Sequence, residues 1–88
     1  MPSGPRCLML MHDNPNESFR MERLAKVADS VADIEGLVGL HDHEGFLTCT
    51  WREPPSRRDL FRIAMVWEFV GHENRPHVEH TRLGKEAA

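Results

Sequence analysis

The strongest indication of fold lies in residues 36–51, GLVGLHDHEGFLTCTW. Two strand-like runs, 37–41 and 46–51, are separated by the four residues DHEG. Such a link is typical of a type I turn closed by a glycine with positive φ, so the stretch predicts a β-hairpin. Successive strand side chains point to opposite faces of a sheet. Leu47, Cys49 and Trp51 should therefore share one face, turned toward the core.

Helices are predicted on both sides of this hairpin. Between about residues 17 and 35, apolar residues recur at three- and four-residue steps and fall on one helical stripe. The stripe consists of Met21, Leu24, Val27, Ala28, Val31 and Ile34. Gly36 is a natural end for this helix. Ser56 then caps a second helix, which should run to Val70.

Two further strands are predicted near the ends of the chain, in the apolar run 6–12 and the alternating run 77–83. The resulting order β–α–β–β–α–β resembles the split-βαβ pattern of the ferredoxin-like superfold. That resemblance implies a small two-layer α+β sandwich, with a four-stranded antiparallel sheet and two helices on one face. We expect a single domain over residues 1–88, with frayed termini at 1–5 and 84–88.

The composition is that of an ordinary globular domain and excludes several classes of partner. Of the 88 residues, 40% are hydrophobic and 28% are charged. A formal net charge of −3 without a basic block disfavours nucleic-acid binding. The longest apolar run, CLMLM, is too short for a membrane span or a signal peptide. We therefore expect a cytoplasmic protein without nucleic-acid or membrane partners.

Histidines gather in two stretches, HDHEG at 41–45 and GHENRPHVEH at 71–80. Imidazole is a common ligand of zinc, copper and nickel, but a site needs three or four converging ligands. The candidate ligands are His41, His43, His77 and His80. Strand residues three apart face opposite ways, so the last two should diverge. In a ferredoxin-like sheet the second and fourth strands are also opposite edges. We therefore expect solvated turn histidines, with no metal or other cofactor.

Patterns for catalysis are weak. The serines lack the surroundings of a nucleophile elbow, and the glycines do not form a phosphate-binding loop. Cys7 and Cys49 form no C-x-x-C pair, and we expect both to be buried thiols. A nucleophilic Cys49 with a histidine is conceivable, but an inward strand cysteine is more often part of a core. We expect no catalytic activity.

The second helix carries the most informative pattern. Its predicted core stripe consists of Leu60, Ile63, Ala64, Trp67 and Val70. A second apolar stripe, Phe61, Met65 and Phe69, lies almost opposite the first. A helix that is apolar all round is normally buried on both sides, yet a two-layer fold covers only one. Either a terminal segment folds over this second stripe, its members are scattered surface hydrophobes, or it is an interface.

These observations favour a small binding or assembly module without catalytic activity of its own. It would form a homodimer, or dock on a protein partner, through helix 57–70. The predicted interface residues are Phe61, Met65 and Phe69, with Arg62 and Glu68 on the flanks. The competing class is a small-molecule or metal-binding protein, or a minor enzyme, that uses the open sheet face or the histidine-rich turns.

Overall fold

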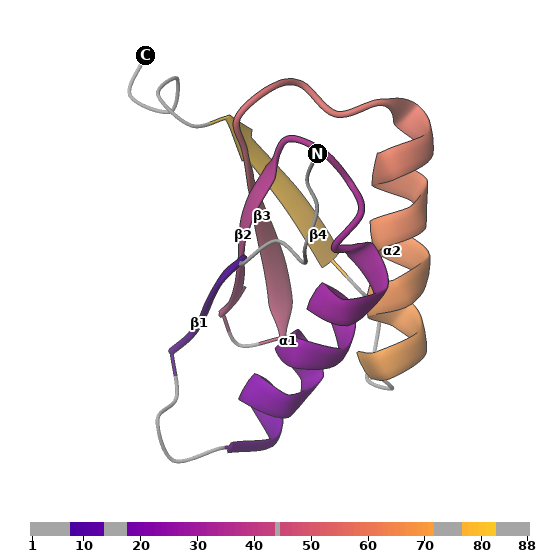
Figure 1. Ribbon diagram of the computed structural model, residues 1–88. Helices are drawn as coiled ribbons and strands as arrows, with labels where there is room; N and C mark the ends of the chain where they lie inside the picture. The colour runs from indigo at the N-terminus through magenta and orange to yellow at the C-terminus, as the bar shows by residue number, and fades with distance from the viewer. Residues whose placement is uncertain (1–7, 14–17, 44, 72–76, 83–88) are drawn as a thin grey trace.

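The fold is an α+β sandwich of one sheet and two helices. The computed structural model describes residues 8–13, 18–43, 45–71 and 77–82. In chain order its elements are β1 (Met9–His12), α1 (Ser18–Val31), β2 (Leu37–His43), β3 (Phe46–Trp51), α2 (Arg57–Gly71) and β4 (His77–Arg82). Both helices lie on the same side of the four-stranded sheet (Figure 1). The predicted α+β class is confirmed, while the expected frayed termini, 1–5 and 84–88, lie outside the described residues.

The sheet is mixed, so the predicted antiparallel, ferredoxin-like sheet is wrong in its strand pairing. The strand order is β1-β2-β3-β4. Only β2 and β3 are antiparallel, whereas β1 pairs with β2 and β3 pairs with β4 in parallel. In a split-βαβ fold another strand separates the two strands that a helix joins. Here each helix joins direct neighbours, so the chain contains two unsplit βαβ units back to back, with the β2–β3 hairpin at the centre.

The hairpin turn is tighter than the sequence suggested. The expected turn residues Asp42 and His43 continue β2, and His43 pairs with Phe46. Gly45 has a φ of 92°, the positive value that the pattern predicted. Its amide donates a hydrogen bond to Oδ1 of Asp42 at 2.9 Å. The side chain of Asp42 therefore closes the turn from inside the strand.

The core lies between the sheet and the two helices. Its buried apolar residues are Leu24, Val27, Val31, Ile34, Leu37, Leu40, Leu47, Cys49, Trp51, Ile63 and Trp67. The inward face of β3 is as predicted. Helix α1 ends at Val31, whereas the sequence predicted a helix to about residue 35. A turn follows, in which the amide of Ile34 donates a hydrogen bond to the Val31 carbonyl at 3.0 Å. Ile34 fills the core from the following turn, while Met21 is 38% exposed.

One buried charge joins the layers. Asp42 is fully buried, and its carboxylate accepts hydrogen bonds from Arg20 at 3.3 Å and Arg23 at 3.1 Å, both on α1. The Arg23 guanidinium also lies 4.7 Å from the ring centre of Trp67 on α2. A buried carboxylate is tolerated only when it is paired and hydrogen-bonded. Asp42 meets that condition through partners from α1 and the hairpin turn.

We expect Asp42→Ala to lower the free energy of unfolding by about 3 kcal/mol, because it removes the buried carboxylate that pairs with two guanidinium groups and accepts a hydrogen bond from a turn amide. Urea denaturation followed by tryptophan fluorescence measures this loss. The matched control is Asp33→Ala, which removes the carboxylate of a solvent-exposed ion pair with Arg62. That control should change stability little. Equal losses in the two variants would contradict the central role of Asp42.

Candidate functional site

The helix layer exposes an apolar stripe on α2. Phe61 is 68% exposed, Met65 49% and Phe69 85%. On the opposite side of the helix, Ile63 and Trp67 are buried against the sheet and α1. A helix can turn only one side toward a single sheet, and burial of this core pair leaves the stripe directed outward. Whether the stripe is an interface stays a prediction.

An open groove of about 600 Å³ runs beside this stripe, between α1 and α2. Its lining residues are Lys26, Asp29 and Ser30 from α1 and Met65, Val66, Phe69 and Val70 from α2. The α2 wall is apolar, whereas the α1 wall is polar and carries both signs of charge. The same surface therefore presents a projecting apolar residue and a hollow that can receive one.

The two flanking residues of the predicted interface differ in what they contact. Arg62 donates two hydrogen bonds, of 2.8 and 2.9 Å, to the Asp33 carboxylate. It donates a third, of 2.7 Å, to the carbonyl of Ser30. The bond from Arg62 lowers the pKa of Asp33 and, reciprocally, raises that of Arg62. Arg62 thus ties α2 to the end of α1 within one chain, while Glu68 is exposed.

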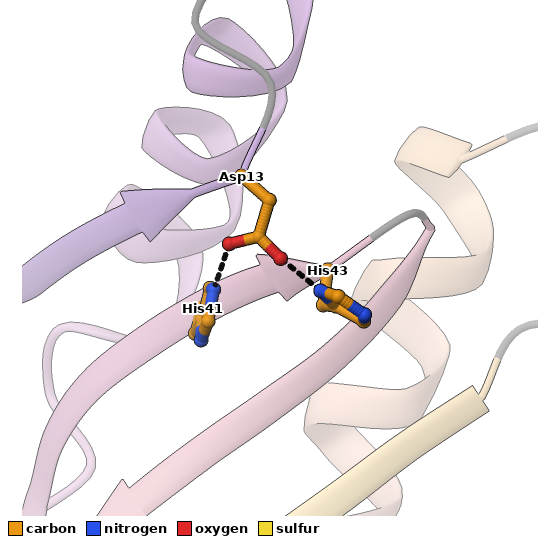
Figure 2. Close-up of side chains that lie close together, drawn as sticks. All are labelled: Asp13, His41 and His43. Atoms are coloured by element: carbon orange, nitrogen blue, oxygen red, sulfur yellow. Dashed lines mark hydrogen bonds and ion pairs between the residues drawn. The ribbon is translucent and has the colours of Figure 1, made fainter.

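The sheet layer brings together a histidine pair and a carboxylate. Asp13 follows β1, and its two carboxylate oxygens point to the rings of His41 and His43 on β2, as Figure 2 shows. His41 Nε2 lies 2.8 Å from Asp13 Oδ1, and His43 Nδ1 contacts Asp13 Oδ2. One potential ligand atom from each residue lies within 4.8 Å of the other two. All three side chains reach solvent, with 36–55% of their surface exposed.

Strand register explains why these residues meet. In the parallel β1–β2 pair, Met11 is the partner of His41 and His12 that of Asp42. The next position along β1 is Asp13, beside His43. Because alternate strand side chains share a face, inward burial of Asp42 sends His41 and His43 to the open face of the sheet. His43 therefore belongs to β2 and not to the expected turn, while His41, the last residue of the predicted strand run 37–41, lies within β2.

The other two candidate histidines are placed differently. His80 pairs with the inward-facing Cys49, on the face opposite His41, and Trp51 Nε1 donates to its Nδ1 at 3.0 Å. Its side chain is exposed, and partial desolvation by its neighbours lowers the pKa of His80. His77 pairs with Phe46 at the hairpin end of β3, and its side chain is not among those that the structure describes.

The prediction that β2 and β4 are opposite edges of the sheet is wrong, because β2 is a central strand.

Asp13 was missed as a candidate ligand. It lies just beyond the predicted strand run 6–12 and was not counted among the candidate ligands. In the predicted split pairing, another strand would have separated the carboxyl ends of β1 and β2 by about 10 Å. In the parallel pair those ends lie together, which is where α/β sheets commonly place their sites. Recognising β1–α1–β2 as an unsplit parallel unit would have found Asp13.

The described cysteine is unsuited to nucleophilic chemistry. Cys49 is a free thiol with no exposed surface. Burial raises its pKa to about 12, so the reactive thiolate is scarce near neutral pH. The expected burial of Cys49 is therefore confirmed, while Cys7 lies outside the described residues.

No family model, curated protein or solved structure matches the chain. In the described part of the chain, neither helix has the length and apolar character to cross a membrane.

Two surfaces of the described structure are candidates for function. One is the α2 stripe with its groove, and the other is the Asp13–His41–His43 cluster on the open sheet face.

We expect Cys49 to react slowly with a thiol reagent in the folded protein and quickly in denaturant. The measurement is the labelling rate at mildly alkaline pH in a Cys7→Ser variant, which leaves Cys49 as the sole thiol. Labelling of the folded protein at the denatured rate would show that the thiol is accessible, and would return Cys49 to the list of reactive groups.

We expect acid to destabilise the fold partly through His80. Its pKa is lowered in the folded state, so the unfolded chain binds the proton more readily. This contribution to stability is complete above the ordinary histidine pKa of about 6.5. It is lost as the pH falls through the lowered folded value.

The measurement is the free energy of unfolding at neutral and mildly acidic pH, for the wild type and for His80→Gln. The amide oxygen of glutamine can still accept the Trp51 hydrogen bond, but it does not titrate. The variant should therefore lose less stability in acid than the wild type. An identical pH dependence would contradict the role of His80.

Proposed function

We propose that this protein is a small assembly module that pairs with a second copy of itself through the α2 stripe, Phe61, Met65 and Phe69. The observation that carries the proposal is the large exposed fraction of two phenylalanines on one side of a single helix. Large side chains in register on one surface are more typical of an association site than of a solvated surface.

Burial of the stripe would stabilise a complex substantially. Each large apolar side chain moved from water into an interface contributes about 1.5–3 kcal/mol. Three such side chains supply several kcal/mol before the loss of translational and rotational freedom is subtracted. That gain is obtained in a fold whose helices already cover their own sheet face, so association requires no rearrangement of the core.

A second copy is the partner that the surface fits best. A twofold contact needs one self-complementary surface. Here Phe69 is 85% exposed and also lines the α1–α2 groove, so each copy offers both an apolar projection and a hollow next to it. The rim is also complementary to itself, because it carries Lys26 together with Asp29 and Glu68. Opposite charges on a rim add little energy but set orientation.

The proposal assigns the protein a role in assembly without a catalytic step of its own. A cytoplasmic location is part of the same proposal, supported by the free thiol of Cys49, which suits a reducing compartment. An apolar helix of a different protein is the competing occupant of the stripe and groove. The association state of the isolated chain separates these two occupants.

We expect the wild type to be a dimer at micromolar concentration and Phe69→Asp to be a folded monomer, because an aspartate buried in the contact would be desolvated without a partner. Sedimentation velocity gives the association state, and far-UV circular dichroism reports the fold. The matched control is Phe46→Asp, which makes the same change at a half-exposed phenylalanine on the opposite, open sheet face. That control should remain dimeric.

Two results would overturn the proposal. A wild-type monomer at high micromolar concentration would exclude self-association and leave the stripe for another protein. Dissociation by Phe46→Asp but not by Phe69→Asp would move the contact to the open face of the sheet.

A further inference from the structure

Three potential metal ligands converge where the parallel strands β1 and β2 end. Asp13 comes directly after β1, and His41 and His43 lie two residues apart on β2. Residues two apart on a strand share a face, so both imidazoles project from the open face of the sheet. Figure 2 shows the Asp13 carboxylate between the two rings, with one oxygen toward each. The cluster is therefore set by the backbone register and not by one chance side-chain contact.

From this arrangement we propose that Asp13, His41 and His43 bind one divalent transition-metal ion of the zinc class. Two imidazole nitrogens and one carboxylate oxygen form a ligand set that proteins use for Zn²⁺ and for Fe²⁺. Nitrogen ligands disfavour Mg²⁺ and Ca²⁺, which take oxygen ligands. The site goes beyond the proposed assembly role, because it lies on the sheet face opposite the α2 stripe.

The distances are compatible with an ion after small side-chain movements. Zinc bonds of about 2.0–2.1 Å to nitrogen and oxygen place neighbouring tetrahedral ligand atoms about 3.3 Å apart. The potential ligand atoms of the cluster lie within 4.8 Å of one another. His41 Nε2 and Asp13 Oδ1 are 2.8 Å apart, which is a hydrogen-bond distance and is shorter than the separation of two ligand atoms around zinc. Side chains that are at least one-third exposed can rotate apart to admit the ion.

Metal binding would replace the two hydrogen bonds to Asp13. Each histidine now donates a ring N–H to the carboxylate. With an ion between them, each ring would hold its proton on the other nitrogen and present a lone pair to the metal. The carboxylate would balance one of the two positive charges. Three protein ligands on an open surface leave at least one position for water or another ligand, as in zinc sites that are not purely structural.

An ion at this position would also join an edge strand to the centre of the sheet. Strand β1 has four residues and pairs only with β2 among the described strands. Its outward side chains, Met9 and Met11, are 62% and 52% exposed. A metal bonded to both Asp13 and β2 would restrain the end of β1. Hydrogen exchange in β1 should therefore slow when the ion binds.

The test is calorimetric titration of the untagged full chain with Zn²⁺, supported by the visible spectrum of bound Co²⁺ and by hydrogen exchange. We expect one ion per chain with micromolar or tighter affinity, and slower exchange in β1. Asp13→Ala and His43→Ala should each weaken binding by at least about tenfold, because both supply a ligand. His43 is 55% exposed, so its removal should preserve the fold, which circular dichroism checks.

The matched control is His80→Gln, which removes an imidazole from the other face of the sheet and should leave Zn²⁺ affinity unchanged. The proposal is overturned if the wild type does not bind Zn²⁺. In that case Asp13, His41 and His43 form only a hydrogen-bonded cluster. It is also overturned if Asp13→Ala binds as tightly as the wild type, or if His80→Gln weakens binding as much as His43→Ala. Phe69→Asp should bind Zn²⁺ normally, so this result and the dimer test are independent.

Discussion

The buried carboxylate of Asp42 is the constraint on which both candidate surfaces depend. Its ion pairs with Arg20 and Arg23 hold it on the helix side of the sheet. Strand alternation then sends its two neighbours, His41 and His43, to the open side. The orientation of the histidine pair therefore follows from the burial of the charge between them. A shift of β2 by one residue would reverse all three side chains.

Arg23 also connects the Asp42 ion pair to the second helix, α2. Arg23 reaches from the Asp42 carboxylate to the ring of Trp67, which is buried between the helices and the sheet. Because Trp67 and Ile63 fill that space, α2 must turn Phe61, Met65 and Phe69 outward. The ion pair of Arg62 with Asp33 holds α2 to the end of α1 at another point. The rotation of α2, and with it the exposed stripe, is thus determined by packing in the same layer that buries Asp42.

The fold leaves two chemically different surfaces on its two sides. The helix layer presents an apolar stripe and a groove with charges of both signs at its rim. The open sheet face presents exposed methionines, Phe46 and the Asp13–His41–His43 cluster. The first surface is suited to hydrophobic contact with another chain, and the second contains side chains with lone pairs for a cation. Because the sheet separates them, a ligand on one surface does not block the other.

The helices, the strands and the hairpin turn could be predicted from the sequence, because the interactions that form them join residues a few positions apart. Ser56 accepts the amide hydrogen bond of Asp59 at 3.1 Å, as a capping residue should, and Gly45 adopts the positive φ that the hairpin requires. The spacing of apolar residues predicts all six elements in the right order and the three-residue stripe on α2.

The mixed pairing of the sheet could not be predicted in this way. The order β–α–β–β–α–β suits both a split and an unsplit pairing, and the choice depends on contacts between residues far apart in the chain. For the same reason Asp13 was missed, since 28 residues separate it from His41, and only the parallel pairing of β1 with β2 brings them together.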